Sequence, residues 1–293
     1  MSDKLENEQW TEVISAHKDL FDVNLSDIWK YRDLIYLFVK RDIVTGYKQT
    51  ILGPLWYVIQ PILTTFTYTL VFSRMAGLST DGVPPIIFYM LGTVMWSYFS
   101  TCLNKTSGTF AGNAGIFGKV YFPRLTVPIA TVMSSMIFFF IQLFIFLLLW
   151  AYYLLFHPGV LHPNWAILWI PYILILMAAF GLGIGIILSS LTTKYRDFNF
   201  LVGFGVQLWM YASPIIYPSS LINKGGLGMG HFTVWANKLN PITPMIEITR
   251  YAFLGKGEYS LNELAYATGC TIVIVIIGVL LFNRIERTFM DTV

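Results

Sequence analysis

Six long apolar segments constrain the fold of this chain more than any other feature of its sequence. Each approaches or exceeds the roughly 20 residues that a helix needs to cross the hydrocarbon core of a bilayer. They are residues 52–73, 84–103, 125–156, 165–191, 199–217 and 264–282. Their apolar runs are continuous rather than alternating with polar residues, which favours helices over a membrane β-barrel. The sequence therefore predicts an all-α integral membrane protein with six transmembrane helices.

The composition agrees with this class and excludes others. Hydrophobic residues make up 56% of the 293 residues and charged residues only 12%, whereas soluble domains carry about 25% charged residues. So little charge cannot cover the surface of a soluble globule of this size. The same numbers exclude a disordered chain. A net charge of +3 is too small to indicate a nucleic-acid partner.

No pattern of catalytic, metal-binding or nucleotide-binding residues stands out. Cys102 and Cys270 lie in apolar segments, so we expect two free buried thiols, and the four histidines lack the spacing of metal ligands. Residues 112–120 come nearest to a phosphate-binding loop. Their glycines are one residue too far apart, and Val120 stands where Ser or Thr would hold Mg²⁺. We therefore predict no catalytic residue, metal or bound cofactor in this chain.

The distribution of Lys and Arg predicts the orientation of the chain, because cytoplasmic flanks collect these residues. The two terminal regions and the loops 104–124 and 192–198 carry fourteen of them, whereas the loops 74–83, 157–164 and 218–263 carry five. Both termini are therefore predicted to be cytoplasmic. Residues 1–28 are acidic and lack the apolar core of a signal peptide. We expect them to form a cytoplasmic segment before a transmembrane domain at 29–293.

Two further stretches are neither spans nor simple loops. Residues 29–45 place charged side chains on one arc of a helix and apolar ones opposite, which predicts an amphipathic helix in the membrane interface. Packing of this helix on other protein is an equally good interpretation, and the two are compatible. Residues 241–254 are apolar but too short to span, and they contain Glu247 and Arg250. We predict a re-entrant or interfacial hairpin on the outer face, covered by protein.

Small residues in the fourth span predict a close helix contact. Gly181, Gly183 and Gly185 form a strip that lets another backbone approach. Packing within the chain is favoured over a contact between two copies.

Polar and aromatic residues recur at helical spacing in three of the predicted spans. The first span carries Tyr57, Gln60, Thr64 and Tyr68, the fifth carries Phe200, Phe204, Gln207 and Tyr211, and the second adds Tyr89, Thr93, Trp96 and Ser100. An amide is costly to leave unpaired in a bilayer, so both glutamines should face protein or a water-filled path. Aromatic faces can stack on sugar rings without a fixed register. We predict that these residues line a conduit, although some rings also fit an interfacial aromatic belt.

Almost no ionisable residue lies inside a predicted span. Proton- or sodium-coupled transporters usually carry intramembrane carboxylates or arginines, and many show two related hydropathy halves. Neither feature is present, so energy for transport would have to come from another subunit.

Four short motifs then suggest the type of transporter to which this chain belongs. They are Lys40-Arg41-Asp42 with YKQTILGPLW at 47–56 and Gln60-Pro61; KVYFPR at 119–124; Tyr195-Arg196-Asp197 with SPIIY at 213–217; and Leu239-Asn240-Pro241 leading to Glu247 and Arg250. Together they resemble the membrane subunit of ABC-2 type exporters that move lipid-linked polysaccharide. The resemblance covers about residues 29–290.

This resemblance implies a homodimer in the bacterial inner membrane, bound by two copies of a separate ATPase that holds ATP and Mg²⁺. The first and fifth spans would line a channel at the dimer seam, and the loop at 112–124 would form the gate. ATPase coupling would fall to Trp29, Asp33, Tyr121, Phe122 and Arg196. Undecaprenyl phosphate or pyrophosphate on the cargo would meet cations at the cytoplasmic entrance, namely Lys40, Arg41, Lys48, Lys119 and Arg124.

Other functions fit the same layout. Some ABC-2 permeases expel small amphipathic drugs, and a membrane scaffold without an ATPase is a third reading. The Gln and Thr residues of the stripes, together with the motif at 47–56, favour a polymer. Among polymers, O-antigen is favoured, with capsule and teichoic acid as alternatives that the residues do not separate.

Overall fold

The computed structural model describes residues 25–48, 51–120, 122–194, 197–223 and 230–288. Within these ranges all regular structure is helical, which confirms the all-α prediction. The elements in chain order are α1 (Leu25–Lys30), α2 (Arg32–Tyr47), η1 (Gly53–Leu55), α3 (Trp56–Tyr68), η2 (Thr69–Met75), α4 (Pro85–Ser107), α5 (Thr109–Phe117), α6 (Thr126–Phe156), η3 (Trp165–Trp169), α7 (Ile170–Lys194), α8 (Phe198–Ala212), α9 (Ser219–Asn223), α10 (Gly230–Leu239), α11 (Ile242–Leu254) and α12 (Leu261–Thr288).

Five of the described helical stretches are long and apolar enough to cross a membrane. They are Gly53–Met75, Pro85–Ser107, Thr126–Phe156, Trp165–Thr192 and Leu261–Arg284, and they match five of the six predicted spans. The remaining prediction, 199–217, corresponds to the shorter helix α8. Its 15 residues extend for about 22 Å at 1.5 Å per residue. The helix ends at Ala212 because Pro214 disfavours a helical conformation at the residue before it, and Ser213 is extended.

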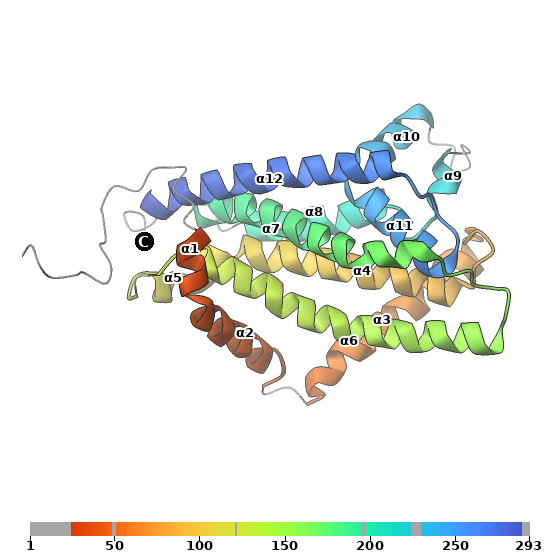
Figure 1. Cartoon of the computed structure of the whole chain (residues 1–293), viewed down its shortest axis with the longest axis horizontal. Helices are drawn as coiled ribbons and strands as arrows, with labels where there is room; N and C mark the ends of the chain where they lie inside the picture. Colours follow the sequence, from red (N-terminus) through yellow and green to blue (C-terminus); the bar gives the residue numbers. More distant parts are fainter. Residues whose placement is uncertain (1–24, 49–50, 121, 195–196, 224–229, 289–293) are drawn as a thin grey trace, which may run out of the picture.

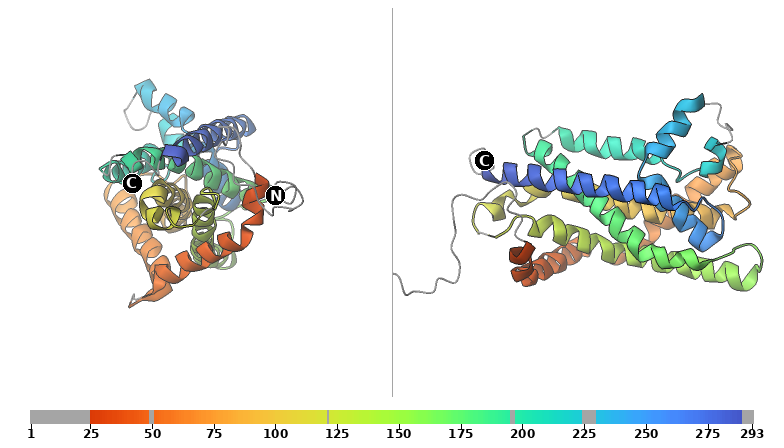
Figure 2. Two further views of the ribbon diagram at one scale, coloured as in Figure 1. Left: turned by 90° about the vertical axis from the view of Figure 1, so that its left-hand side faces the viewer. Right: turned by 45° about the horizontal axis from the view of Figure 1, so that its top comes forward.

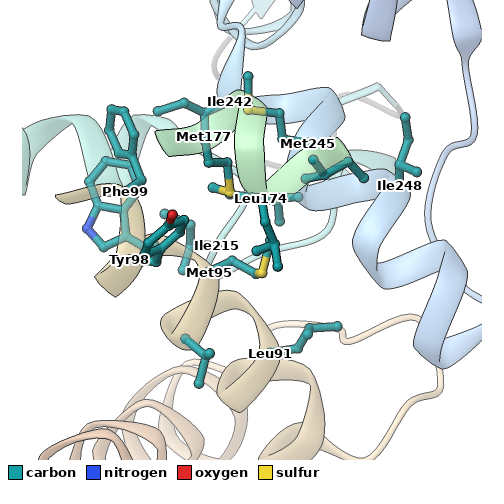
Figure 3. Packing of buried hydrophobic residues seen from close by; sticks show 14 of the residues in the cluster. Leu91, Met95, Tyr98, Phe99, Leu174, Met177, Ile215, Ile242, Met245 and Ile248 are labelled. Atoms are coloured by element: carbon teal, nitrogen blue, oxygen red, sulfur yellow. The ribbon is translucent and has the colours of Figure 1, made fainter. Parts of the chain in front are cut away.

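The helices form one bundle with α4 near its centre (Figures 1 and 2). α4 packs against α3, α6, α7 and α8, and α7 in turn packs against α12. Most of α4 is therefore buried, including Ile87, Val94 and Phe99, which have no exposed surface. Figure 3 shows side chains of α4 meeting residues of α7 and α11 in this core.

The glycine strip of α7 lets its neighbours approach closely on two sides. A Cβ atom at Gly185 would lie 2.6 Å from Cβ of Thr106 and 2.9 Å from the backbone oxygen of Leu103, both in α4. A Cβ atom at Gly183 would lie 3.1 Å from Cα of Val275 in α12. The strip therefore serves packing within the chain, as predicted.

One end of the bundle gathers α1, α2, α5 and the C-terminal end of α12 (Figure 1). A separate apolar cluster holds this end together, and it comprises Phe38, Val39, Phe110, Phe117, Phe122, Val127, Ala130, Ile186 and Phe282. The apolar side of α2 packs into this cluster and onto α6. The helix predicted over 29–45 therefore exists, apart from a turn at Tyr31 between α1 and α2, and its apolar face meets protein.

The opposite end holds α9, α10 and α11 (Figure 1). Residues 241–254, predicted as a hairpin, contain one helix, α11, and all of its residues except Tyr251 are buried. Pro244 lies in its first turn, where proline is tolerated, so nothing reverses the chain within this stretch. The turn of any hairpin in this region lies at Asn240 and Pro241, between α10 and α11.

Both cysteines are free, as expected, but only Cys102 is fully buried. Cys270 is half-buried on α12, whose outer face is largely exposed.

The glycine strip generates a stability prediction. Gly185→Leu should lower the yield and thermal stability of the folded chain, by at least the roughly 1–3 kcal/mol of an overpacked core. The reason is that Leu103 presents backbone rather than a movable side chain. Gly269→Ala is the control, because a Cβ atom at Gly269 in α12 meets nothing within 4 Å. Equal melting temperatures for the two variants in detergent would contradict the assignment.

Candidate functional site on α3, α4 and α8

Helix α8 turns one polar-aromatic face away from the bundle. Phe200, Phe204 and Tyr211 are 82%, 61% and 46% exposed, and Gln207 is also exposed. The opposite side of the helix, with Val202, Val206 and Met210, is buried. The spacing of four residues over three turns thus does define a single face, and all four predicted side chains lie on it. We call these four residues the α8 stripe.

The C-terminal end of α3 touches α8, where the hydroxyl of Tyr68 donates to Sδ of Met210 over 3.5 Å. The predicted residues of α3 occupy different environments. Gln60 is exposed, whereas Thr64 and Tyr68 are half-buried. The ring of Tyr57 stacks on Phe138 of α6, with centroids 4.0 Å apart. Tyr57 is therefore partly engaged in packing, and the other three are available at a surface or cavity.

A cavity of about 170 Å³ opens between α3, α4, α6 and α8. Its lining combines amides, hydroxyls and two aromatic rings. The lining residues are Gln60, Pro61, Thr64, Tyr68, Thr93, Trp96, Ser97, Ser100, Gln142 and Met210. The stripes of the first and second predicted spans thus meet in one place, which only the packing of α3 on α4 could show.

Gln142 is a cavity residue that the sequence stripes missed. It lies in α6, it is 8% exposed, and it is the single amide in a 31-residue helix that is otherwise largely apolar. The argument applied to Gln60 and Gln207 also applies to it, because an amide within an apolar span needs a polar neighbour. That rule could have identified Gln142 from the sequence.

Tyr89 is placed differently from the prediction. It has no exposed surface and lies in the core, in edge contact with Tyr68 and Phe88. The reason is that α4 is surrounded by other helices, so a regular stripe on it does not select a free face. Trp96, about two turns further along α4, does line the cavity.

The cations predicted at the entrance lie near the α2 end of the bundle, in unlike settings. Lys40, Lys48 and Lys119 are exposed. Arg41 is paired with Asp42 at 2.9 Å and donates to Asn113 at 3.4 Å. The guanidinium of Arg124 lies over the ring of Phe117, 5.5 Å from its centroid. Three of the five predicted cations therefore have their charge available to solvent.

Lys105 was not among the predicted entrance residues. Its ammonium lies 5.1 Å from the ring centroid of Phe138, on which Tyr57 stacks. Lys105 therefore lies close to the N-terminal end of α3, where Tyr57 is, at the end of the bundle that carries the predicted cations.

The residues predicted to couple to an ATPase also differ in placement. Trp29 is 71% exposed, and Asp33 is exposed. Phe122 is instead buried between Phe38 and Phe117, with centroid distances of 5.7 and 5.8 Å. Its role in this structure is to hold α2 against the bundle. Tyr121 and Arg196 lie outside the described residues.

At the other end, a buried ion pair anchors the segment that follows α8. Nη1 of Arg250 lies 3.1 Å from Oε1 of Glu247, and the two side chains are 1% and 4% exposed. Nη2 of Arg250 donates to the backbone oxygen of Ile215 at 2.7 Å, and Nη1 donates to that of Tyr217 at 3.3 Å. Burial lowers the pKa of Arg250, and Glu247 opposes that shift. The guanidinium thus supplies donors to backbone carbonyls of the non-helical segment that follows α8.

A sequence profile of the ABC-2 type transporter family matches residues 33–254, which is most of the chain. This chain belongs to the ABC-2 type transporter family. The matched region of this ABC-2 chain includes α3, α4 and α8, the basic residues from Lys40 to Arg124, and the Glu247–Arg250 pair.

Individual relatives of the ABC-2 chain share modest identity over most of their length. The O-antigen export system permease protein RfbA of Klebsiella pneumoniae is 28% identical over 261 residues, covering 88% of this chain and 94% of the relative. RfbA of Myxococcus xanthus is 26% identical over 196 residues, covering 67% and 72%. The polysialic acid transport protein KpsM of Escherichia coli is 21% identical over 260 residues, covering 86% and 93%.

The ion pair yields a second prediction. Arg250→Met should lower the stability of the ABC-2 chain by about 3–5 kcal/mol, because it leaves the Glu247 carboxylate buried without its partner. Arg74→Met, at an exposed arginine, should change it little. Thermal unfolding in detergent measures both. The double variant Arg250→Met/Glu247→Leu should recover part of the loss, and failure to do so would argue against a charge effect.

Proposed function

We propose that this chain is the membrane-spanning subunit of an ATP-driven exporter that moves lipid-linked polysaccharide, most specifically O-antigen, across the bacterial inner membrane. Two copies of the chain would enclose a conduit at their seam, and two copies of a separate ATPase would supply the energy. The chain itself would bind no cofactor and hydrolyse no ATP. The names of the relatives support the class of cargo, since RfbA is an O-antigen permease and KpsM transports polysialic acid.

The outward face of α8 is the observation that carries this proposal. Gln207 and Tyr211 lie on the surface of an apolar helix together with two phenylalanines. Hydrocarbon cannot satisfy an amide, so this face needs protein or water beside it. A second copy of the chain facing the same stripe would supply both, and the space between the copies would carry polar and aromatic walls. Such walls suit a sugar polymer, which offers hydroxyl groups and apolar ring faces.

The basic end supports the direction of transport. Lys40, Lys48 and Lys119 are exposed near α2 and α5, and the excess of Lys and Arg predicts that this end is cytoplasmic. A lipid phosphate or pyrophosphate arriving from the cytoplasm would find these charges first. The same end presents Trp29 and Asp33, which we propose as part of the surface that contacts the ATPase.

Efflux of small amphipathic molecules is the alternative within the family. A drug-sized ligand usually occupies a mostly apolar site of roughly 300–1,000 Å³. The cavity beside α3 is smaller, at about 170 Å³, and is lined by amides and hydroxyls. A second, apolar hollow of about 410 Å³ has the volume of a drug site, but its lining (Tyr266, Gly269, Cys270, Val273 and Ile274) comes from one face of α12 alone, so it does not enclose a ligand. The α8 stripe and the cavity beside α3 therefore favour a polymer of hydroxylated units.

Removal of rings from the α8 stripe tests the conduit. Phe200→Ala/Phe204→Ala/Tyr211→Ala should reduce surface polysaccharide at least tenfold in a complementation assay, while co-purification with the ATPase is retained. These side chains are exposed, so folding should be little affected. The control triple Phe140→Ala/Phe144→Ala/Tyr152→Ala removes exposed rings of α6 and should export normally. Equal export by both triples would contradict a conduit on α8.

The ATPase interface has its own test. Trp29→Ala should weaken binding of the ATPase at least tenfold, because an exposed tryptophan is the type of residue that dominates interface energy. Trp235→Ala removes an exposed tryptophan of α10, at the opposite end, and should leave binding unchanged. Pull-down of the ATPase from membranes, with ATP hydrolysis measured for the chain alone and for the pair, gives both readouts. Hydrolysis of ATP by the chain alone would contradict the proposal that a separate subunit hydrolyses it.

A further inference from the structure

The cavity between α3, α4, α6 and α8 contains a polar group that the protein does not satisfy. Gln142 is 8% exposed, lines the cavity, and has no hydrogen-bond partner within the described part of the chain. The amide keeps some accessible surface within the cavity, so it is free to bond to whatever occupies that space. Nothing in the apolar packing of α6 requires an amide at this position, since Leu or Met would fill a similar volume. The side chain is therefore placed for something that enters the cavity.

The hydroxyl groups of the cavity complement an amide. Thr93 donates to the backbone oxygen of Met90 at 3.0 Å, and its own oxygen lies 3.5 Å from the hydroxyl of Thr65, which leaves it one of two lone pairs. Ser100 donates to the backbone oxygen of Ser97 at 3.2 Å. Each donor is thus occupied by its own helix, and each oxygen keeps a lone pair for a ligand. Gln142 and Gln60 provide both donors and acceptors. A ligand with several hydroxyl groups, which also donate and accept, matches this set.

The absence of charge in the lining and the size of the cavity limit the class of ligand further. None of the residues that line the cavity carries a charge at neutral pH, and an isolated carboxylate or phosphate would lose its hydration there without a cation to replace it. The volume of about 170 Å³ corresponds to roughly five water molecules at ~30 Å³ each. The rings of Trp96 and Tyr68 add apolar wall, which fits the C–H face of a single sugar ring.

The mouth of the cavity lies on α3. Gln60 lines it and is also exposed on α3, while Gln142 lies at its buried side. A group projecting from a polymer that lies along α3 could therefore enter past Gln60 and reach Gln142.

We propose that this cavity is a subsite for one uncharged sugar unit, in which Gln142 is the inner hydrogen-bonding residue. The subsite accepts a neutral hexose and rejects a uronate. It deepens the proposed function, on which it rests, by placing a specificity-determining contact in α6, away from the α8 stripe. A polymer whose units enter it one at a time would be held in register during transport.

Protection of a cysteine in the cavity tests the proposal. The reporter chain carries Ser97→Cys with Cys102→Ala and Cys270→Ala, and it is assembled with its ATPase in lipid nanodiscs. The measurement is the rate of labelling by a methanethiosulfonate reagent in the presence of millimolar methyl glycosides of glucose, galactose or mannose, or of methyl glucuronide. At least one neutral glycoside should slow labelling several-fold, and the glucuronide should not.

Two further variants separate binding from structure. Gln142→Met, of similar volume, should abolish protection while leaving the sugar-free labelling rate unchanged. Asn104→Leu, which removes an exposed amide of α4 outside both the cavity and the α8 stripe, should keep protection. The proposal is overturned if no neutral glycoside protects, if the glucuronide protects equally, or if protection survives in Gln142→Met.

Failure of the subsite proposal and failure of the proposed function give different results. Export is measured by complementation, independently of cysteine protection. A chain that exports polysaccharide without protection by any glycoside refutes the subsite alone. A chain whose cavity is protected but which exports no polysaccharide refutes the proposed function and leaves a sugar-binding cavity to be explained.

Discussion

The cost of a polar group in hydrocarbon is the constraint on which the rest of this structure depends. Backbone groups satisfy it by forming helices throughout the described part of the chain. Side chains satisfy it in three ways. Arg250 meets Glu247 and two backbone carbonyls inside the protein, the α8 stripe turns outward toward a proposed seam, and Gln142 faces a cavity. Each of these three arrangements marks a position whose role goes beyond spanning the membrane.

These places are connected through α4. The helix packs against α3, α6, α7 and α8, so it sets the positions of both polar-aromatic helices relative to the cavity. Its own position depends on the close approach of α7 at Gly181 and Gly185. At one end Arg250 lies over the ring of Phe88 in α4, 3.9 Å from its centroid. A change in the α4 contacts would therefore reach the cavity and the end of α8 together.

The amphipathic pattern of α2 fits contact with the membrane surface as well as contact with protein. Phe38 and Val39 are buried in the cluster formed with α5, α6, α7 and α12, whereas Lys40 and Asp33 face outward. The sequence left membrane contact and protein contact open, and the structure shows the protein contact. Because Phe122 belongs to the same cluster, a residue of the motif at 119–124 has a packing role that the resemblance alone did not reveal.

The sequence by itself determined the class, because apolar length and low charge leave helices in a membrane as the stable outcome, and its motifs indicated the family that the profile match then established. Helical spacing also predicted that Phe200, Phe204, Gln207 and Tyr211 share one face of α8, and the packing of the other helices leaves that face exposed. Prediction from the sequence failed at Tyr89, because a stripe on a helix enclosed by others has no free side, and at 199–217, where Pro214 ends α8 before the apolar run ends. The tertiary structure alone decided which residues share the cavity, because Gln60, Thr93 and Gln142 come from three helices whose relative rotation depends on side-chain packing between them.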